Sequence, residues 1–469
     1  TRRSCGTSRR DASELDCNER LTPPRAEHHR LPRPRRGATF RAVTAQTPPS
    51  LLARLLARST AIEPHELPAV SAAFSLFFCV LGGYFAVRPI RETIGTTLGS
   101  DRVADLWFFT SLGAVIIVPL YGWLVGRVRR SVLLPTIYAL VAGAFVTYGV
   151  LFRTRPDDLT LASTFYVGLS VLNLLLVSVF WSFLLELFTS EQTKRLFGVI
   201  STGGTLGALV GPIVTDLVVQ RIGTSGVLFI GAALFTGAIV SQRVLIAIWK
   251  APGGAGAGND RAIGGNPFAG VALVLKSPFL LMIALFVVLL STTNTLLYFQ
   301  QLEIVARTFT DTADRTQVFA RIDYIVQTLT VFSQFFLTGR IAKHFGVTAL
   351  LVTLPLIIMG GFLVLATTGT FAVLATVLVV RRWGEYAFIR PGREMLFSRL
   401  DTEAKYKAKN LIDVPVYRGA DVLVAQLQNA LRAGGLTATG VALLGAGAAL
   451  AWAGIGTWLG RRHEGARNT

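Results

Sequence analysis

The sequence predicts an all-α polytopic membrane protein with about twelve transmembrane helices, arranged as two six-helix halves. Three observations predict this fold class. The chain has 469 residues, of which 52% are hydrophobic and only 16% are charged, whereas a soluble globular chain is about 25% charged. Residues 106–125 and 279–297 carry no charge, and about 20 apolar residues can cross a bilayer as a helix. A flexible, glycine-rich stretch between residues 250 and 266 divides the apolar segments six and six.

Hydropathy along the chain gives the individual spans. We expect them at residues 68–92, 104–126, 132–152, 159–186, 197–220, 225–247, 277–300, 317–338, 347–367, 370–398, 411–432 and 436–459. The remaining segments complete the expected organisation: a disordered basic tail (1–60), an N-terminal half (61–249), a cytoplasmic linker (250–272), a C-terminal half (273–462) and a C-terminal tail (463–469).

Basic residues set the expected orientation of the helices. Arg129 and Arg130 follow the second span, Lys194 and Arg195 follow the fourth, and Arg461 follows the last. Because cytoplasmic loops carry an excess of Lys and Arg, we expect both termini to be cytoplasmic. Much of the net charge of +19 lies in these loops and in the tail, where residues 1–58 hold 13 Arg against five acids. The charge therefore does not require a nucleic-acid partner, and the expected surroundings are the lipid bilayer.

The sequence lacks the patterns of an enzyme or a metal protein. Cys5, Cys17 and Cys79 have neither a disulfide nor a metal-binding spacing, and the five histidines are scattered. No nucleophile–base pair or phosphate loop is recognisable. We therefore expect no catalytic activity, no metal and no cofactor, and we expect a monomer.

Two similar charged clusters, one in each half, lie inside predicted spans. The first is Arg88-Pro-Ile-Arg-Glu92, and the second is Arg390-Pro-Gly-Arg-Glu394. A charged side chain inside a membrane span costs about 2.5 kcal/mol or more unless it faces a wet cavity or a partner. The repetition therefore predicts a polar path between the two halves.

The arginines of these clusters are suited to anions, because each guanidinium presents a planar fork to phosphate or carboxylate. Arg88 and Arg91 share one helical face. The predicted substrate-binding residues are Arg88, Arg91, Arg382, Tyr386, Arg390 and Arg393. Beside them, Glu92, Glu385 and Glu394 are candidate gating or ion-pair residues. The alternative is that the glutamates only pair with the arginines and lock the helices together.

Two further groups are candidates. Asn294 and Tyr298 share a face of the seventh span, where an amide and an aromatic ring suit a planar group such as a base. Hydrogen bonds between helices are the alternative. Asp413 and Arg418 enter the eleventh span, and Glu186 ends the fourth, as candidate gating or ion-pair residues.

Four glycines of the fifth span have a structural interpretation. Gly203, Gly204, Gly207 and Gly211 lie three or four residues apart, and small residues at this spacing allow two helices to approach closely. We expect them to mark a helix–helix contact and to bind no ligand.

Two sets of motifs carry a resemblance to known families. The basic loops at residues 122–130 and 338–346 resemble a loop motif of the major facilitator superfamily. The segment Tyr386–Met395, followed by Lys407–Asp413, resembles the nucleotide transporter family, which comprises the ATP/ADP translocases of plastids and intracellular bacteria with their bacterial relatives. The resemblance implies a major-facilitator fold, exchange of ATP for ADP, and phosphate-holding basic residues on spans 1 and 10. It also places the protein in a bacterial cytoplasmic (inner) membrane.

The chain departs from that family at two positions. Arg91 and Arg393 stand where the best-known carriers tend to have lysine, and the two residues are not interchangeable at a phosphate site.

We therefore expect a secondary transporter that works by alternating access on a small anionic substrate, with ATP and ADP as the leading candidates. One alternative is a proton-coupled porter for organic anions, peptides or drugs, with Glu186 and Glu385 as protonatable groups. Another is a membrane receptor or assembly protein that transports nothing, in which the charged clusters are saturated ion pairs.

Overall fold

The computed structural model describes residues 62–249, 269–398 and 408–465, and the statements below concern these ranges. All regular structure in them is helical. The predicted tail (1–60) and the predicted linker up to residue 268 lie outside the described residues, as do residues 399–407 and 466–469.

Four long helices make up the N-terminal half: α2 (Leu67–Arg127), α3 (Arg130–Thr154), α4 (Leu159–Leu187) and α5 (Ser190–Ile248). Two of them contain two predicted spans each. α2 turns at Gly99 (φ 79°) and α5 at Gly223 (φ 68°). Glycine adopts such a positive φ at no steric cost, so these two positions separate span 1 from span 2 and span 5 from span 6.

The C-terminal half consists of α6 (Ala269–Lys276), α7 (Pro278–Thr308), α8 (Thr312–Phe336), α9 (Thr338–Thr368), α10 (Phe371–Gly384), η1 (Glu385–Ile389), α11 (Arg390–Phe397), η2 (Ile412–Val416), α13 (Tyr417–Ala433) and α14 (Ala438–Gly465). The π-helical turn η1 joins α10 to α11 as span 10, and η2 precedes α13 in span 11. The fold class of about twelve helices in two halves is thus confirmed, with boundaries that differ by several residues. Residues 269–272, which the sequence assigns to the linker, begin α6.

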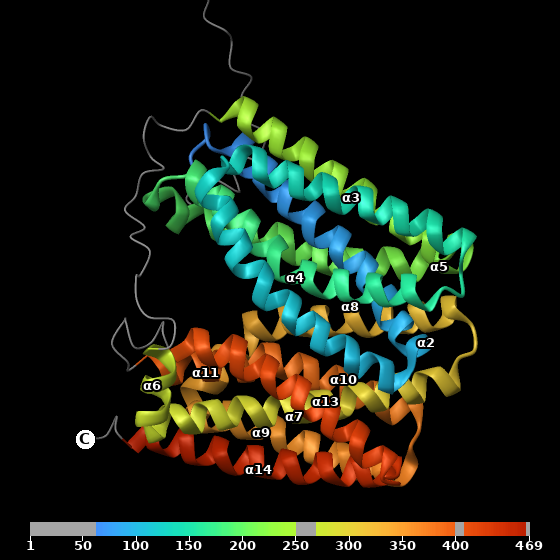
Figure 1. Ribbon diagram of the computed structural model, residues 1–469. Coiled ribbons are helices and arrows are strands. Elements are labelled where there is room, and N and C mark those ends of the chain that lie inside the picture. Colours follow the sequence, from blue (N-terminus) through green and yellow to red (C-terminus); the bar gives the residue numbers. More distant parts are fainter. Residues whose placement is uncertain (1–61, 250–268, 399–407, 466–469) are drawn as a thin grey trace, which may run out of the picture. The chain divides into compact units, whose positions relative to one another are not determined.

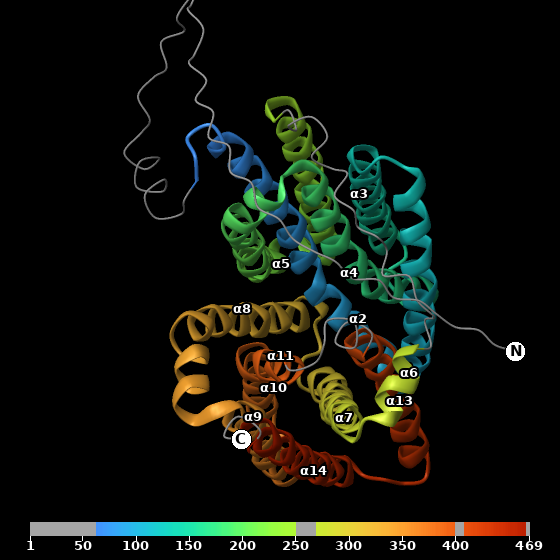
Figure 2. The same ribbon diagram turned by 90° about the vertical axis from the view of Figure 1, so that its left-hand side faces the viewer.

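Each half has its own apolar core. Phe180 and Phe235 belong to the core of the N-terminal half, and Phe362 and Trp452 belong to that of the C-terminal half. Helices α2–α5 (blue to green) form one bundle, and α7–α14 (yellow to red) form the other (Figures 1 and 2). A smaller cluster that includes Phe299 joins the halves, and α8 packs against α2 and α5 where the bundles meet.

The helices differ in how apolar they are. Eight helical stretches among the described residues are long and apolar enough to cross a membrane, and one of them, Ser190–Ile248, covers two predicted spans. Spans 8, 10 and 11 do not reach this level. α8 carries charges such as Arg321 and Asp323, and spans 10 and 11 are interrupted by η1 and η2. These three spans turn charged side chains towards the interior, as does span 1 with Arg88, Arg91 and Glu92.

The glycines of span 5 lie where α5 crosses α2, as the sequence predicts. A Cβ at Gly207 would collide with the carbonyl oxygen of Phe78, and a Cβ at Gly211 would lie 2.5 Å from the carbonyl oxygen of Gly82. The two backbones therefore touch, and no side chain fits between them. This contact fixes the position of α2 and of the charged cluster that it carries.

We predict that Gly207→Ala lowers the stability of the protein, whereas Gly198→Ala on the same helix does not. A methyl group at residue 207 meets backbone, and overpacking of this kind costs about 1–3 kcal/mol. At residue 198 the space is open, and replacing a mid-helix glycine by alanine stabilises by about 0.5–1 kcal/mol. Thermal unfolding of the two variants in detergent measures the difference. Equal melting temperatures would contradict the close backbone contact.

Candidate functional site

A cavity of about 570 Å³ lies between the two halves. Its walls come from α2 and α4 of the N-terminal half and from α7, α8, α10, η1, α11, η2 and α13 of the C-terminal half. Among the described residues that line it, eight are basic and six are acidic, so two positive charges are in surplus. A charged cavity between two apolar bundles is a place for a polar ligand, and the surplus favours an anion.

The cavity brings together all but one of the residues predicted from the sequence. Those that line it are Arg88, Arg91, Glu92, Asn294, Tyr298, Arg382, Glu385, Tyr386, Arg390, Arg393, Glu394, Asp413 and Arg418. The exception is Glu186, which is exposed near the end of α4 and is not among the lining residues.

Asp323 is the central residue that the sequence analysis missed. It lies near the middle of α8 and is only 1% exposed. Its Oδ1 accepts hydrogen bonds from Arg88 Nη1 (3.0 Å) and from Arg382 Nη1 (2.5 Å). Because Arg88 belongs to the N-terminal half and Arg382 to the C-terminal half, one buried carboxylate connects the two bundles. Its sequence signal is a carboxylate near mid-span, where a charge is costly without a partner.

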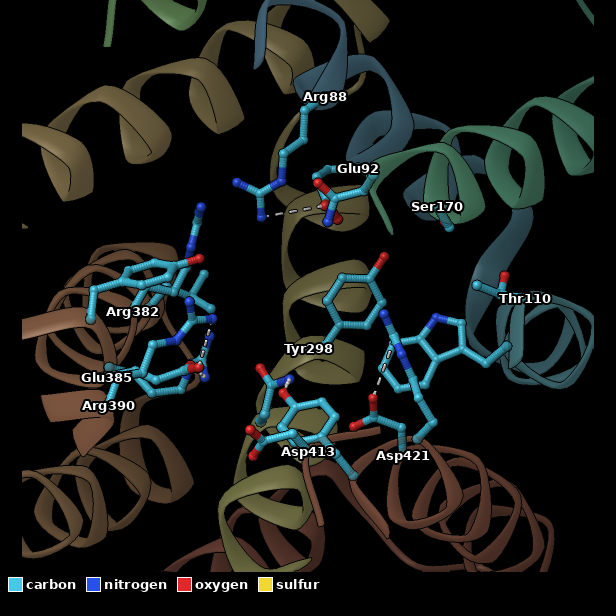
Figure 3. A pocket seen from close by; sticks show the side chains of 18 of the residues that line it. Arg88, Glu92, Thr110, Ser170, Tyr298, Arg382, Glu385, Arg390, Asp413 and Asp421 are labelled. Carbon is cyan, nitrogen blue, oxygen red and sulfur yellow. Dashed lines mark hydrogen bonds and ion pairs between the residues drawn. The ribbon is translucent and has the colours of Figure 1, made fainter. Parts of the chain in front are cut away.

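Sharing of a carboxylate between two arginines recurs in the cavity. Glu92 lies 4.0 Å from Arg88 and 3.7 Å from Arg91. Glu385 lies 3.1 Å from Arg381 and 3.5 Å from Arg390. Figure 3 shows Arg88 and Glu92 on one wall of the cavity and Glu385 and Arg390 on another. With Asp323 included, three carboxylates serve five arginines, so the arginines are neutralised only in part.

Some arginine donors have no partner at all among the described residues. The Nε atoms of Arg91, Arg381 and Arg393 are buried without a hydrogen-bond acceptor. A guanidinium has five N–H donors, and a buried donor without an acceptor is costly. An anionic ligand in the cavity would supply the missing acceptors.

A second part of the cavity is aromatic and also holds Arg91, whose guanidinium carbon lies 4.8 Å from the centre of the Tyr166 ring. The hydroxyl groups of Tyr166 and Tyr298 lie 2.7 Å apart, and Trp107 Nε1 donates to the Tyr166 hydroxyl at 2.9 Å. Hydroxyl and amide side chains line the cavity near these rings: Thr110, Ser111, Ser170, Asn173, Asn294 and Gln301. Figure 3 shows Thr110 and Ser170 on the side of the cavity opposite Arg382 and Arg390. The lining therefore offers one charged end and one end suited to a planar, hydrogen-bonding group.

The two ends of the bundle differ. At the end far from the start of α2, the halves meet in polar contacts: Thr93 Oγ1 lies 2.8 Å from Thr316 Oγ1, and Arg321 Nε donates to Asp216 Oδ1 at 2.9 Å. The lining residues Arg393 and Asp413 lie towards the other end. At that end α2 begins and α14 ends, on the left of Figure 1. We call this the terminal end. Among the described residues, contacts between the halves close the cavity at the end opposite the terminal one.

Ion pairs border the cavity towards the terminal end. Arg393 lies 3.1 Å from Asp413, and Lys409 lies 2.5 Å from Glu394. Each pair joins the end of span 10 to the start of span 11. Both pairs lie within the C-terminal half, so they leave the two halves free to separate at this end.

Comparisons with known proteins agree with this geometry. The Major Facilitator Superfamily profile matches residues 31–389. "ADP,ATP carrier protein 1" of Chlamydia muridarum is 24% identical over 434 residues, which covers 76% of this chain and 80% of the relative. The protein of the same name from Chlamydia trachomatis is also 24% identical, with the same coverage.

Solved structures resemble the fold. A variant of the nucleoside transporter NupG has a TM-score of 0.60 at 14% identity, covering 84% of this chain and 99% of its own. A bacterial homologue of the iron transporter ferroportin has a TM-score of 0.59 at 12% identity, with coverages of 84% and 99%. The profile match over most of the chain, together with a twelve-span fold in two halves, shows that this chain belongs to the Major Facilitator Superfamily of membrane transporters.

Proposed function

We propose that this transporter exchanges nucleotides, ATP and ADP foremost, or another phosphorylated metabolite, by alternating access. The observation that carries the proposal is the arginine surplus in the cavity, where three shared carboxylates face five arginines and where buried Nε donors lack acceptors. Arginine forks bind phosphate in two parallel hydrogen bonds. A phosphate chain reaching from Arg91 on one half towards Arg393 on the other would use these donors.

The aromatic part of the cavity favours a nucleotide over inorganic phosphate. Tyr298 and Trp107 offer ring faces, and Asn173, Asn294 and Gln301 offer amide donors and acceptors. A base can stack on the rings and bond to the amides, while its phosphates reach the arginines. The similarity to ADP,ATP carriers at 24% identity supports the same substrate class, as does the likeness in fold to a nucleoside transporter.

Exchange follows from the charge of the cavity. Moving an unneutralised cluster of arginines through the apolar interior is costly, and the cavity holds two more basic than acidic groups. A bound anion removes this surplus. The halves then reorient readily only when loaded, so that one anion leaves for each that enters. By the placement of basic loops we expect the terminal end to face the cytoplasm.

A proton-coupled porter that uses Glu186 or Glu385 as its proton site is less well supported than the exchanger. Glu186 does not line the cavity. Glu385 lies between Arg381 and Arg390 and is the shared ion-pair partner of both. These two observations favour the anion exchanger over a porter that uses either glutamate as its proton site.

We predict that Arg91→Ala and Arg393→Ala each reduce exchange by at least about tenfold, since a hydrogen bond to a charged group contributes about 1.5–3 kcal/mol. The measurement is uptake of labelled ATP into proteoliposomes loaded with ADP, beside empty ones. Arg102→Ala, which changes an exposed arginine outside the cavity, is the control and should behave like the parent protein.

Two results of this assay would contradict the proposal. Normal uptake in both cavity variants would remove the arginines from the phosphate site. Uptake that is equally fast into empty vesicles would rule out obligatory exchange, although it would leave a nucleotide transporter.

We predict that Asp323→Asn destabilises the empty protein and increases its stabilisation by ATP. Removing one partner of a buried ion pair costs about 3–5 kcal/mol, and here two arginines lose their carboxylate. A phosphate group can replace the lost charge. Glu394→Gln is the matched control, because its pair with Lys409 is half-exposed and exposed pairs contribute about 1 kcal/mol or less.

Thermal unfolding with and without ATP tests this prediction. If Asp323→Asn and Glu394→Gln lose equally little stability, Asp323 does not hold the two halves together. If ATP stabilises Asp323→Asn no more than it does the parent protein, the phosphates do not take the place of this carboxylate.

A further inference from the structure

One carboxylate of the cavity has a different environment from the others. Asp421 lies on α13 and is 4% exposed. Its Oδ1 accepts hydrogen bonds from two hydroxyl groups of α7, Ser291 Oγ at 2.5 Å and Thr295 Oγ1 at 3.3 Å. Its Oδ2 lies 3.7 Å from Nη1 of Arg418, one turn away on the same helix.

Arg418 is only loosely paired with Asp421. Each of the other five carboxylates that line the cavity either lies within 3.1 Å of a basic nitrogen or is shared between two arginines. Asp421 has only the contact with Arg418, whose side chain is 34% exposed and also lines the cavity. Among these carboxylates, Asp421 is therefore the one most easily left without a counter-charge.

The described groups around Asp421 include no second cation that could take the place of Arg418. From α7 it receives only hydroxyl groups. The charged group of η1 that lines the same cavity is Glu385, which carries the same sign of charge as Asp421. From α2, which packs on α13, the acids Asp101 and Asp105 contact the helix further along, at Asn429 and Gln426. Burial itself also favours the neutral carboxyl group.

We propose that Asp421 takes up a proton when an anionic substrate binds, with Arg418 as the link between the two events. The inference rests on the proposed function, because it needs an anion in the cavity. A phosphate oxygen competes with Asp421 for the Arg418 guanidinium. When Arg418 turns to the phosphate, Asp421 loses its counter-charge in a buried site.

The proton balance of this step is simple. The ion pair between Arg418 and Asp421 is replaced by one between Arg418 and the phosphate, and Arg418 stays protonated throughout. One proton from the water of the cavity forms an O–H bond on Asp421. Ser291 and Thr295 remain as hydrogen-bond partners of the neutral carboxyl group. The substrate then crosses the membrane with one proton, which lowers the net negative charge that moves.

The sign of the resulting pH dependence is fixed by linkage. Because binding takes up a proton, affinity for the anion rises as pH falls, by up to about tenfold per pH unit in the window where the free protein is ionised and the complex is protonated. Asp421→Asn mimics the protonated carboxyl group. It should bind ATP at high pH as tightly as the parent protein does at low pH.

The test is calorimetry of ATP binding to the full-length protein in two buffers of different ionisation enthalpy, at about pH 8, where phosphate groups with a pKa near 6 are already ionised. We expect uptake of about one proton per ATP in the parent protein and nearly none in Asp421→Asn. Glu191→Gln removes an exposed carboxylate that does not line the cavity, and its proton uptake should equal that of the parent.

Ser291→Ala gives an independent measurement on a milder variant. The Ser291 hydroxyl donates to the ionised carboxylate, so its removal favours protonation and should shift the pH dependence of ATP affinity to higher pH. An unshifted profile, or proton uptake that is unchanged in Asp421→Asn, would overturn this inference and leave nucleotide exchange standing. Absence of ATP binding to the parent protein would overturn both.

Discussion

Asp323 accepts hydrogen bonds from Arg88 of one half and Arg382 of the other, and the rest of the site is arranged around this shared charge. In an apolar interior, isolated arginines are too costly to keep, but fully paired arginines have no reason to bind an anion. When two arginines share one carboxylate, each is paired in part, which is intermediate between an isolated and a fully paired arginine. It keeps the empty cavity stable while leaving donors for a ligand.

The same constraint explains where the helices depart from regular geometry. Spans 10 and 11 carry most of the charged residues of the cavity, and each contains a π-helical turn, η1 at Glu385–Ile389 and η2 at Ile412–Val416. Such turns are common at functional sites because they change the direction of side chains within a helix. Span 1, which carries Arg88, Arg91 and Glu92, has no such turn. The close contact of α2 with α5 holds Arg88 opposite α8.

The sequence predicts the fold well, because the thickness of a bilayer sets the length of each span, so that spans can be counted along the chain. The glycine-rich stretch between residues 250 and 266 then divides them evenly. It also identifies Arg88, Arg382 and Arg390 as lining residues, since arginine within a span needs a polar neighbour. It does not identify Asp323 as their partner, because that pairing joins residues 235 positions apart and depends on how the halves pack. The sequence also predicts Glu186 as a gating or ion-pair residue, although it does not line the cavity. This too depends on how the helices pack.

The measurement that tests the central claim most directly is the thermal unfolding of the purified protein with adenosine, pyrophosphate, ADP and ATP side by side. If the arginines are only partly neutralised, ADP and ATP stabilise the protein most, pyrophosphate stabilises it less, and adenosine stabilises it least. If none of the anions raises the melting temperature, the arginines and carboxylates form a permanent network, and the cavity is not a site for phosphorylated ligands.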